Sequence, residues 1–229
     1  DNCKHKFTKR FSGQSDISLK KIDNVDSALI VGCGSIGKRH LGNLKKLEIN
    51  KLYAKRTKKG YTQNLPKKLK VNEFATWKQA LAQNYDIAII SNPSSLHLET
   101  IRKVIKNVKG IFIEKPLSHN LYGCNNVFKL LKKSKVVSFV GNNLLFNTIV
   151  NKINSFISNN DLGQLINMQI QAGQYLPDWH PYEDFKNSYF SRKDLGGGVL
   201  LTLIHEIQLA INYAGKPSEV SCFLQHNYF

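Results

Sequence analysis

Short apolar runs recur along the first two thirds of the chain, separated by longer amphipathic stretches. Continuous apolar runs, as opposed to alternating ones, are typical of strands that are buried on both faces of a parallel sheet. We therefore predict strands at 28–31, 51–54, 86–90, 110–113 and 136–140.

The stretches between these runs have the apolar spacing of helices. They predict helices at 36–46, 77–83, 96–107 and 121–134. Strands that alternate with helices indicate an α/β fold with a doubly wound parallel sheet. Because right-handed crossovers can place helices on either face, both faces of this sheet should be covered.

The rhythm changes after Phe146, where apolar runs become weaker and aromatic residues gather. We predict, in order, a helix at 148–158, a strand at 164–174, an aromatic loop at 176–190, a helix at 199–213 and a strand at 218–225. This second region should therefore be a separate α/β unit with a small sheet.

The composition is that of a folded, globular protein. The 229 residues are 41% hydrophobic, and no apolar run reaches the roughly 18 residues of a membrane span. Of the four cysteines none forms a CxxC pair, and their spacings fit no zinc site. We therefore expect reduced thiols, a cytoplasmic location, no membrane partner and no bound metal.

The formal net charge of +17 raises the question of a nucleic-acid partner. The lysines are scattered along the chain, however, and no RNA- or DNA-binding motif accompanies them. We expect no nucleic acid, and salt-sensitive retention on DNA or RNA would contradict this. The positive field also suits an anionic cofactor or substrate.

A glycine-rich loop follows the first predicted strand and opens the first predicted helix. It reads Gly32-Cys33-Gly34-Ser35-Ile36-Gly37. In dinucleotide-binding domains the first glycine of GxGxxG allows a tight turn, the second lets a pyrophosphate approach, and the third lets helix and strand pack closely. The helix N-terminus then stabilises the phosphate charge. This context favours a Rossmann domain that binds NAD or NADP, with every residue of the loop except Cys33 as a candidate contact.

The second predicted strand bears on the choice between NAD and NADP. Dinucleotide domains usually place an acid near its end, where the acid binds the ribose hydroxyls. Residues 51–60 contain no acid, and Lys55 and Arg56 stand there instead. Because Arg56 can bind a 2′-phosphate through two parallel hydrogen bonds, we slightly favour NADP. The alternative is that these cations are surface residues of a lysine-rich chain.

Two further loops follow later strands, at the sheet edge where ligands bind in open α/β folds. One is Ser91-Asn92-Pro93-Ser94-Ser95-Leu96-His97, which is also compatible with an ordinary turn capped by Ser95. The other is Glu114-Lys115-Pro116, whose lysine would point into the same crevice.

The segments GCGSIGKRH, SNPSSLHLE, EKPLS and GGGVLLTLIHEI, in this order and spacing, resemble the glucose–fructose oxidoreductase/inositol dehydrogenase/MocA family. The resemblance runs from about Ser27 to the end of the chain, and the Glu-Lys-Pro motif is its most specific part. Within the family, 173–181 and 203–206 are similar to members found with surface-sugar and nonulosonate biosynthesis genes.

The resemblance implies an NAD(P)-dependent oxidoreductase that acts on a hydroxyl or carbonyl group of a sugar, a cyclitol or a related compound. It implies that Lys115 holds the nicotinamide ribose and the reacting hydroxyl, that Glu114 contacts the ribose, and that His205 transfers the proton. Histidine suits this step because its unperturbed pKa is about 6.5, and a lysine stabilises a developing alkoxide. The nicotinamide side would be lined by Asn92, Pro93 and His97.

The resemblance also implies a domain organisation. Residues 1–26 would be a basic leader or an upstream remnant, 27–146 the Rossmann domain, and 147–229 the first part of a C-terminal substrate and oligomerisation domain. Because family proteins continue with several more strands, we expect this chain to be a fragment. We expect the full-length form to be a homo-oligomer.

Three positions depart from the family pattern. Thr202 and Gln208 stand where aspartate is common, and Leu145 stands where many members have arginine. The last two changes would weaken substrate positioning or subunit packing. The alternative function is therefore a non-enzymatic dinucleotide-binding remnant that lacks a complete substrate cleft.

Overall fold

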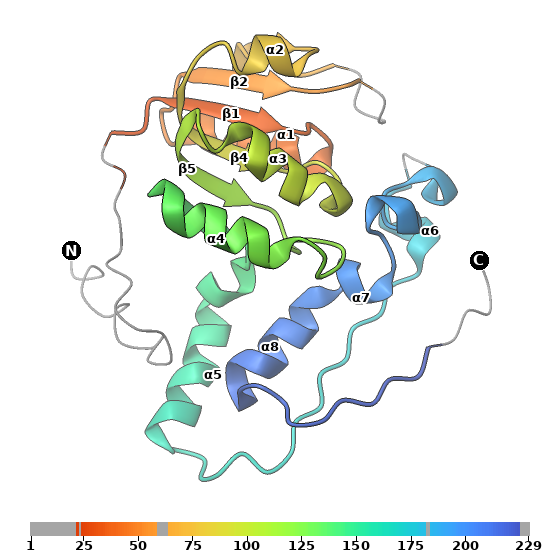
Figure 1. Cartoon of the computed structure of the whole chain (residues 1–229). Helices are drawn as coiled ribbons and strands as arrows, with labels where there is room; N and C mark the ends of the chain where they lie inside the picture. The colour runs from red at the N-terminus through yellow and green to blue at the C-terminus, as the bar shows by residue number, and fades with distance from the viewer. Residues whose placement is uncertain (1–21, 23, 59–63, 182–183, 225–229) are drawn as a thin grey trace.

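The computed structural model describes residues 22, 24–58, 64–181 and 184–224. Within these residues one parallel sheet of six strands has the order β3-β2-β1-β4-β5-β6 (Figure 1). The strands are β1 Ser27–Val31, β2 Lys51–Lys55, β3 Asn72–Phe74, β4 Tyr85–Ile90, β5 Val108–Ile113 and β6 Val137–Val140. The strand order reverses between β1 and β4, which is where ligands bind in such folds. The predicted fold class is confirmed.

Helices follow the strands much as the apolar spacing predicted. They are α1 Ser35–Lys46, α2 Trp77–Ala80, α3 His97–Val104 and α4 Cys124–Ser134, with the short 3-10 turns η1 Lys67–Leu69 and η2 Ser94–Leu96. The prediction missed β3, and it made α2 too long. Thr76 is the N-cap of the short α2, and its side chain and that of Gln79 form a reciprocal capping box.

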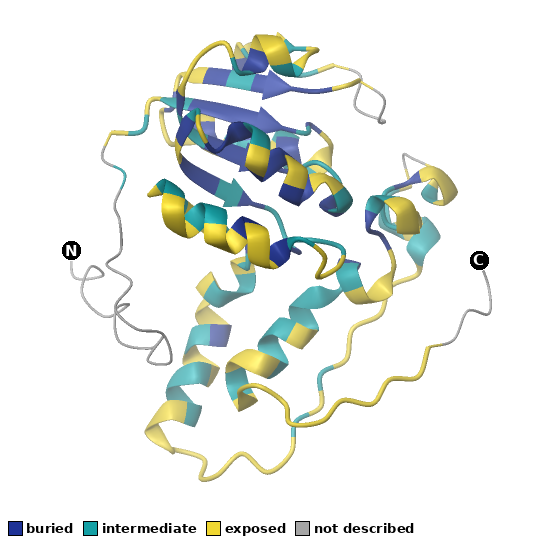
Figure 2. Ribbon diagram, in the orientation of Figure 1, coloured by how far each residue is buried: buried dark blue, intermediate teal, exposed yellow. Residues whose placement is uncertain are grey.

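The core lies on both faces of the sheet because successive strand residues point to opposite sides. Leu29 and Val31 of β1 pack on one face with residues of α3 and α4, among them Ile101 and Val127. Ala28 and Ile30 pack on the other face with residues of α1. Figure 2 shows these strands as the most deeply buried part of the molecule.

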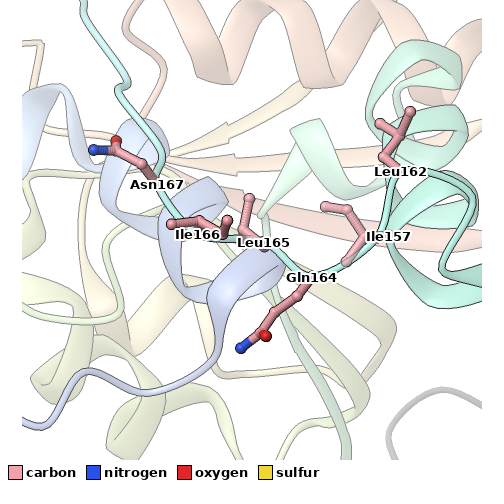
Figure 3. A pocket seen from close by; sticks show the side chains of 7 residues that line it. Ile157, Leu162, Gln164, Leu165, Ile166 and Asn167 are labelled. Atoms are coloured by element: carbon pink, nitrogen blue, oxygen red, sulfur yellow. The ribbon is translucent and has the colours of Figure 1, made fainter.

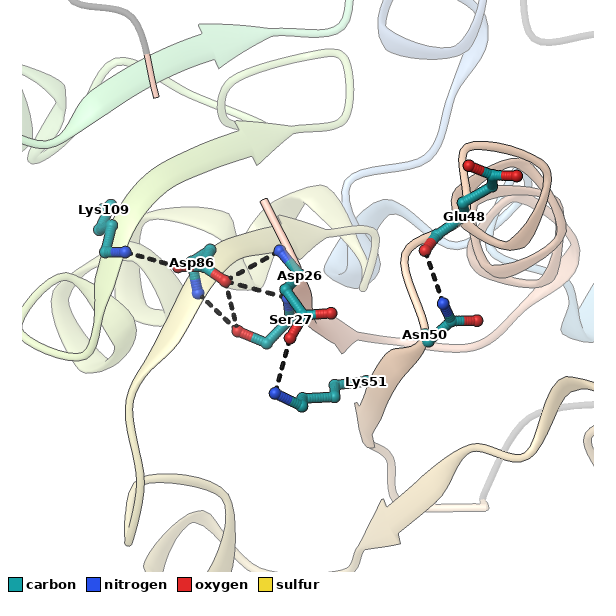
Figure 4. A network of polar contacts seen from close by, with 7 residues as sticks. All are labelled: Asp26, Ser27, Glu48, Asn50, Lys51, Asp86 and Lys109. Carbon is teal, nitrogen blue, oxygen red and sulfur yellow. Dashed lines mark hydrogen bonds and ion pairs between the residues drawn. The ribbon is translucent and has the colours of Figure 1, made fainter. Parts of the chain in front are cut away.

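A polar network fixes the amino-terminal ends of the central strands (Figure 4). The carboxylate of Asp86 accepts hydrogen bonds from the backbone N–H groups of Asp26 and Ser27, at 3.1 and 3.0 Å, and from Ser27 Oγ at 2.8 Å. Lys109 Nζ lies 2.6 Å from its other oxygen. The pKa of Asp86 lies well below its usual range. The largest cause is the hydrogen bond from Lys109, and the hydrogen bonds from Asp26 and Ser27 lower the pKa further. The network therefore joins the starts of β1, β4 and β5.

The second half of the chain is helical in the described residues. Its helices are α5 Thr148–Asn159, α6 Leu176–Trp179, α7 Val199–Thr202 and α8 Ile204–Ala214, with 3-10 turns η3 Asn143–Phe146, η4 Phe185–Asn187 and η5 Lys193–Leu195. The helix predicted at 199–213 is interrupted at Leu203, whose ψ of 37° is not helical. The predicted loop at 176–190 also contains two short helical turns.

The two strands predicted in this half are wrong for the residues described. Residues 164–174 and 218–224 have no regular secondary structure, and Gln225 lies outside the described residues. A strand needs hydrogen-bonding neighbours and a buried face. Instead, Ile166 is 93% exposed and Phe223 is 97% exposed.

A surface hollow lies where α5 ends (Figure 3). It is lined by Ile157, Leu162, Gly163, Gln164, Leu165, Ile166 and Asn167. None of these is a predicted site residue.

Among the described residues, no single helix is long and apolar enough to cross a membrane; only the bent pair Lys193–Thr202 and Ile204–Ala214 reaches that length and composition together.

Candidate functional site

The loop between β1 and α1 needs glycine at its first and last motif positions. Gly32 has a φ of +91°, and a Cβ built there would lie 2.5 Å from the backbone nitrogen of Asn92. A Cβ on Gly37 would lie 2.2 Å from the carbonyl oxygen of Gly32. The tight turn and the close packing of helix on strand therefore both depend on missing side chains.

Gly34 differs from these two because a Cβ there would meet nothing within 4 Å. It is the N-cap of α1 in an extended conformation, and no side chain caps the helix. The first turn holds no acid, so nothing there repels an anion. Open space in front of free backbone N–H groups fits the pyrophosphate of a dinucleotide, which Gly34, Ser35 and Ile36 would hold.

Glu114 and Lys115 follow β5 directly, and their side chains contact different parts of the molecule: Glu114 contacts α1 and Lys115 contacts α7. Glu114 Oε1 lies 2.6 Å from His40 Nε2 on α1, and both side chains are 15% exposed. This contact joins the glycine-loop helix to the Glu-Lys-Pro loop. Sequence reasoning gave His40 no role, although it stands in the GCGSIGKRH segment. The predicted contact of Glu114 with a ribose stays a prediction.

Lys115 connects the sheet edge to the second half of the chain. Its Nζ donates to the backbone carbonyl of Thr202, 2.8 Å away, between β5 and α7. Burial lowers the pKa of Lys115. His205 lies in the first turn of α8, and burial, followed by the positive charge of Lys115, lowers its pKa. Lys115 therefore contacts the chain three residues before His205, and its charge acts on the imidazole.

The imidazole of His205 is held from one side. Its Nδ1 lies 3.2 Å from Gln208 Oε1, and Gln208 Nε2 donates to Asn142 Oδ1 at 2.7 Å. Asn142 comes two residues after β6 ends. The sequence alone does not reveal these linked hydrogen bonds, because Asn142 and Gln208 are 66 residues apart.

The loop after β4 contains the predicted site residues Asn92 and Pro93. Asn92 Nδ2 donates to Thr100 Oγ1 at 2.9 Å, and Asn92 Oδ1 is buried without a hydrogen-bond partner among the described residues. Such an acceptor fits a cofactor amide or hydroxyl. Pro93, partly exposed, leads into η2.

His97 is buried between the loops that follow β4 and β5, and its predicted place on the nicotinamide side stays a prediction. It is 1% exposed, and its ring nitrogens lie 2.9 Å from the Pro116 carbonyl oxygen and 2.8 Å from the Asn92 carbonyl oxygen. Its ring atoms therefore bridge the loops after β4 and β5.

Two more buried oxygens without a hydrogen-bond partner in the described part of the chain are Thr202 Oγ1 and Glu206 Oε2. Thr202 is the residue whose carbonyl binds Lys115, and the charge of Glu206 acts on both Lys115 and His205. Buried acceptors without partners are costly unless a ligand or water satisfies them. Their position beside Lys115 suits a ligand with several hydroxyl groups.

Arg56 has a partner that the sequence did not reveal. It is 6% exposed, and its Nη1 lies 3.6 Å from Glu73 Oε2, in β3. Lys58 Nζ lies 3.5 Å from the same oxygen. An acid therefore does stand beside the end of β2, supplied by the neighbouring strand, which sequence spacing along β2 alone cannot show.

The strand order of this parallel sheet reverses between β1 and β4, and the GxGxxG loop lies at that point. Together these two features define a dinucleotide-binding Rossmann domain. Residues 27–142 match the family model "Oxidoreductase family, NAD-binding Rossmann fold", and residues 150–228 match "GFO/IDH/MocA C-terminal domain". The chain belongs to the glucose–fructose oxidoreductase/inositol dehydrogenase/MocA family, as the motifs indicated.

Individual relatives are distant. Myo-inositol 2-dehydrogenase of Thermotoga maritima is 26% identical over 194 residues, which are 83% of this chain and 55% of that protein. 2,7-anhydro-N-acetylneuraminate hydratase of Escherichia coli is 25% identical over 142 residues, 62% of this chain and 37% of that protein. The chain thus spans about half or less of the length of these curated relatives.

The solved structures include the WlbA dehydrogenase of Bordetella pertussis in complex with NADH and UDP-GlcNAcA. It aligns with a TM-score of 0.66 at 18% identity and covers 84% of this chain and 59% of its own. This likeness shows a shared fold that extends beyond the Rossmann domain.

Proposed function

We propose that this protein is an NAD(P)-dependent oxidoreductase that transfers a hydride between the nicotinamide and a hydroxyl-bearing carbon of a sugar or cyclitol. The observation that carries the proposal is that Lys115, from the end of β5, donates to the carbonyl of Thr202, three residues before His205, and that its charge acts on the His205 imidazole. Both lie at the sheet edge that the glycine loop also borders.

Each residue has a task that its surroundings support. The nicotinamide, when bound, accepts or gives the hydride. His205 takes the hydroxyl proton during oxidation and returns it during reduction, because a lowered pKa keeps its ring neutral near pH 7. Lys115 polarises the same oxygen with its ammonium group.

The substrate class rests on two supports. The buried oxygens Thr202 Oγ1 and Glu206 Oε2 would accept hydrogen bonds from a polyol. The names of relatives point the same way, since one is a myo-inositol 2-dehydrogenase and another is a dehydrogenase in complex with NADH and UDP-GlcNAcA. Family membership does not favour a remnant without activity.

The proposal is tested by turnover with NAD(H) and NADP(H) on a panel of cyclitols and nucleotide sugars. Lys115→Met should lower turnover on the order of 10²-fold or more, the scale of a lost electrostatic stabiliser. His205→Gln should lower it too and remove the acidic limb of the pH profile, which should lie below about 6.5 because the pKa is lowered. Full activity in both variants would refute these assignments.

We also propose that NADP(H) binds at least as tightly as NAD(H), through Arg56. Because Glu73 already forms an ion pair with Arg56, the preference for NADP(H) over NAD(H) should be small and should depend on the Glu73 carboxylate. Arg56→Ala should weaken NADPH binding by about 1–3 kcal/mol and leave NADH nearly unchanged. Glu73→Gln should strengthen NADPH binding. Equal affinities for both cofactors in all three proteins, measured by nicotinamide fluorescence, would contradict the proposal.

A further inference from the structure

We propose that Gln208 is a positioning residue that fixes His205 in the Nδ1–H form and so leaves Nε2 as the atom that accepts the substrate proton. The inference deepens the proposed function and rests on it for its catalytic part. Its structural part concerns the imidazole alone and can be tested without substrate.

The argument begins at Asn142. Its side-chain oxygen lies 2.7 Å from Gln208 Nε2, and an amide oxygen only accepts hydrogen bonds. With Asn142 oriented in this way, the Gln208 amide group turns its NH₂ toward it. Its carbonyl oxygen then faces the other way, 3.2 Å from Nδ1 of His205.

The second step follows from the chemistry of a neutral imidazole, which has one N–H donor and one acceptor nitrogen. Gln208 Oε1 can only accept, so Nδ1 of His205 must carry the proton. Nε2 then keeps its lone pair. This nitrogen makes no hydrogen bond among the described residues, and it is the ring atom left for a ligand.

A neutral amide does this without adding charge next to the ring. The charged groups that act on His205 are Lys115 and Glu114 from the end of β5 and Glu206 on α8 itself. Burial and Lys115 oppose protonation, whereas the hydrogen bond to Gln208 and the two carboxylates favour it, and the net result is a lowered pKa. A carboxylate in place of Gln208 would make the same hydrogen bond but would raise the pKa of His205. The amide selects the tautomer and leaves the ring neutral near pH 7.

The primary test is ¹⁵N NMR of the protein labelled at histidine, with the His205 signals identified by their loss in His205→Gln. The wild type should show a protonated Nδ1 and an unprotonated Nε2 above its pKa. Gln208→Leu should give a mixture of both tautomers. Gln208→Glu should keep the Nδ1–H form, because Asn142 can rotate its amide to donate, and should raise the His205 pKa.

Kinetics supply the second readout. Gln208→Leu should lower kcat by a factor of roughly three to ten, the size expected from one net hydrogen bond, with KM little changed. Gln208→Glu should move the acidic limb of the pH profile to higher pH. Asn142→Leu should act in the same direction as Gln208→Leu and more weakly.

Asn212→Leu is the matched control. Asn212 is also on α8, and its amide donates to Asn154 Oδ1 of α5 at 2.8 Å, so it tests helix docking without touching His205. It should leave the tautomer and the pH profile unchanged. If Gln208→Leu fails to fold, Gln208→Glu and Asn142→Leu decide the question.

The outcomes separate the two claims. A wild-type His205 protonated at Nε2, or a tautomer that Gln208→Leu does not change, overturns the positioning role. A tautomer that shifts as expected in a protein without turnover on any substrate leaves the positioning role intact and counts against the proposed function.

Discussion

The two halves of the chain differ in how their side chains are buried. Up to Phe146, apolar residues pack on both faces of an open parallel sheet, and α1, α3 and α4 cover it. After Phe146, Val150 is the one buried hydrophobic residue in the described ranges. Figure 2 shows α5 and α8 as mostly intermediate or exposed. The first half is held by its own core, whereas the second half meets it through polar contacts such as Lys115 with the Thr202 carbonyl.

The two halves also differ in how firmly they position the residues of the proposed site. The glycine loop follows β1, and the packing of the sheet against its own helices fixes the position of that strand. His205 sits on α8, which contacts α5 through an amide pair and reaches the sheet edge through Gln208 and Asn142. Cofactor binding should therefore tolerate changes in the second half better than catalysis does.

The largest effect should come from the cofactor loop, which belongs entirely to the first half. Gly34→Val should abolish detectable dinucleotide binding, because the new side chain would fill the space in front of the α1 N-terminus. It should leave the melting curve nearly unchanged, since the site is open and the backbone is extended. Titration followed by nicotinamide fluorescence measures the first effect.

Gly42→Val is the control for this substitution. Gly42 lies on the same helix and also has open space where a Cβ would stand. Its variant should bind the dinucleotide as the wild type does. Unchanged affinity in a folded Gly34→Val protein would refute the pyrophosphate assignment.

The next effect compares two isoleucines, one from each half. Ile101 of α3 is fully buried, and Ile101→Ala should lower the free energy of unfolding by about 2–5 kcal/mol. Ile149 of α5 is 68% exposed, and Ile149→Ala should change it by about 0.5 kcal/mol or less. Denaturant unfolding measures both. Equal losses would show that the second half has a core comparable to the first.

A smaller effect should come from Asp86 in the polar network. Asp86→Asn should lower the free energy of unfolding by about 1–3 kcal/mol, because an amide cannot accept all the hydrogen bonds that the carboxylate accepts. The pKa is depressed in the folded state, so the contribution is present above about pH 4 and is lost as the pH falls. Asp86→Asn should flatten the acid part of the pH–stability curve. Parallel curves for the two proteins would contradict this role.

The sequence predicted the first half well because its signals are local. Strands buried on both faces are continuous apolar runs, and a glycine loop between strand and helix has few alternatives. The edge strand β3 escaped because Asn72-Glu73-Phe74 is short and mostly polar. Its position also hid Glu73, whose contact with Arg56 depends on strand order.

The second half was predicted less well because its signals depend on partners. Weak alternation at 164–174 predicts a strand only if a neighbouring strand is present, and none lies alongside among the described residues. No glycine or proline marks the break at Leu203 in the sequence, so the apolar spacing predicts one continuous helix. The Lys115 and His205 roles came from motif resemblance, and only three-dimensional contacts revealed Gln208 and Asn142.

The Asp86 network has a consequence for how this protein can change over evolutionary time. It ties β1, β4 and β5 together at the sheet edge opposite the glycine loop, and none of its hydrogen bonds involves a residue of the proposed site. Selection can therefore alter the loops that follow these strands without loosening the register of the strands themselves. A lineage can change what these loops bind while its folding stability is maintained at the far end of the sheet.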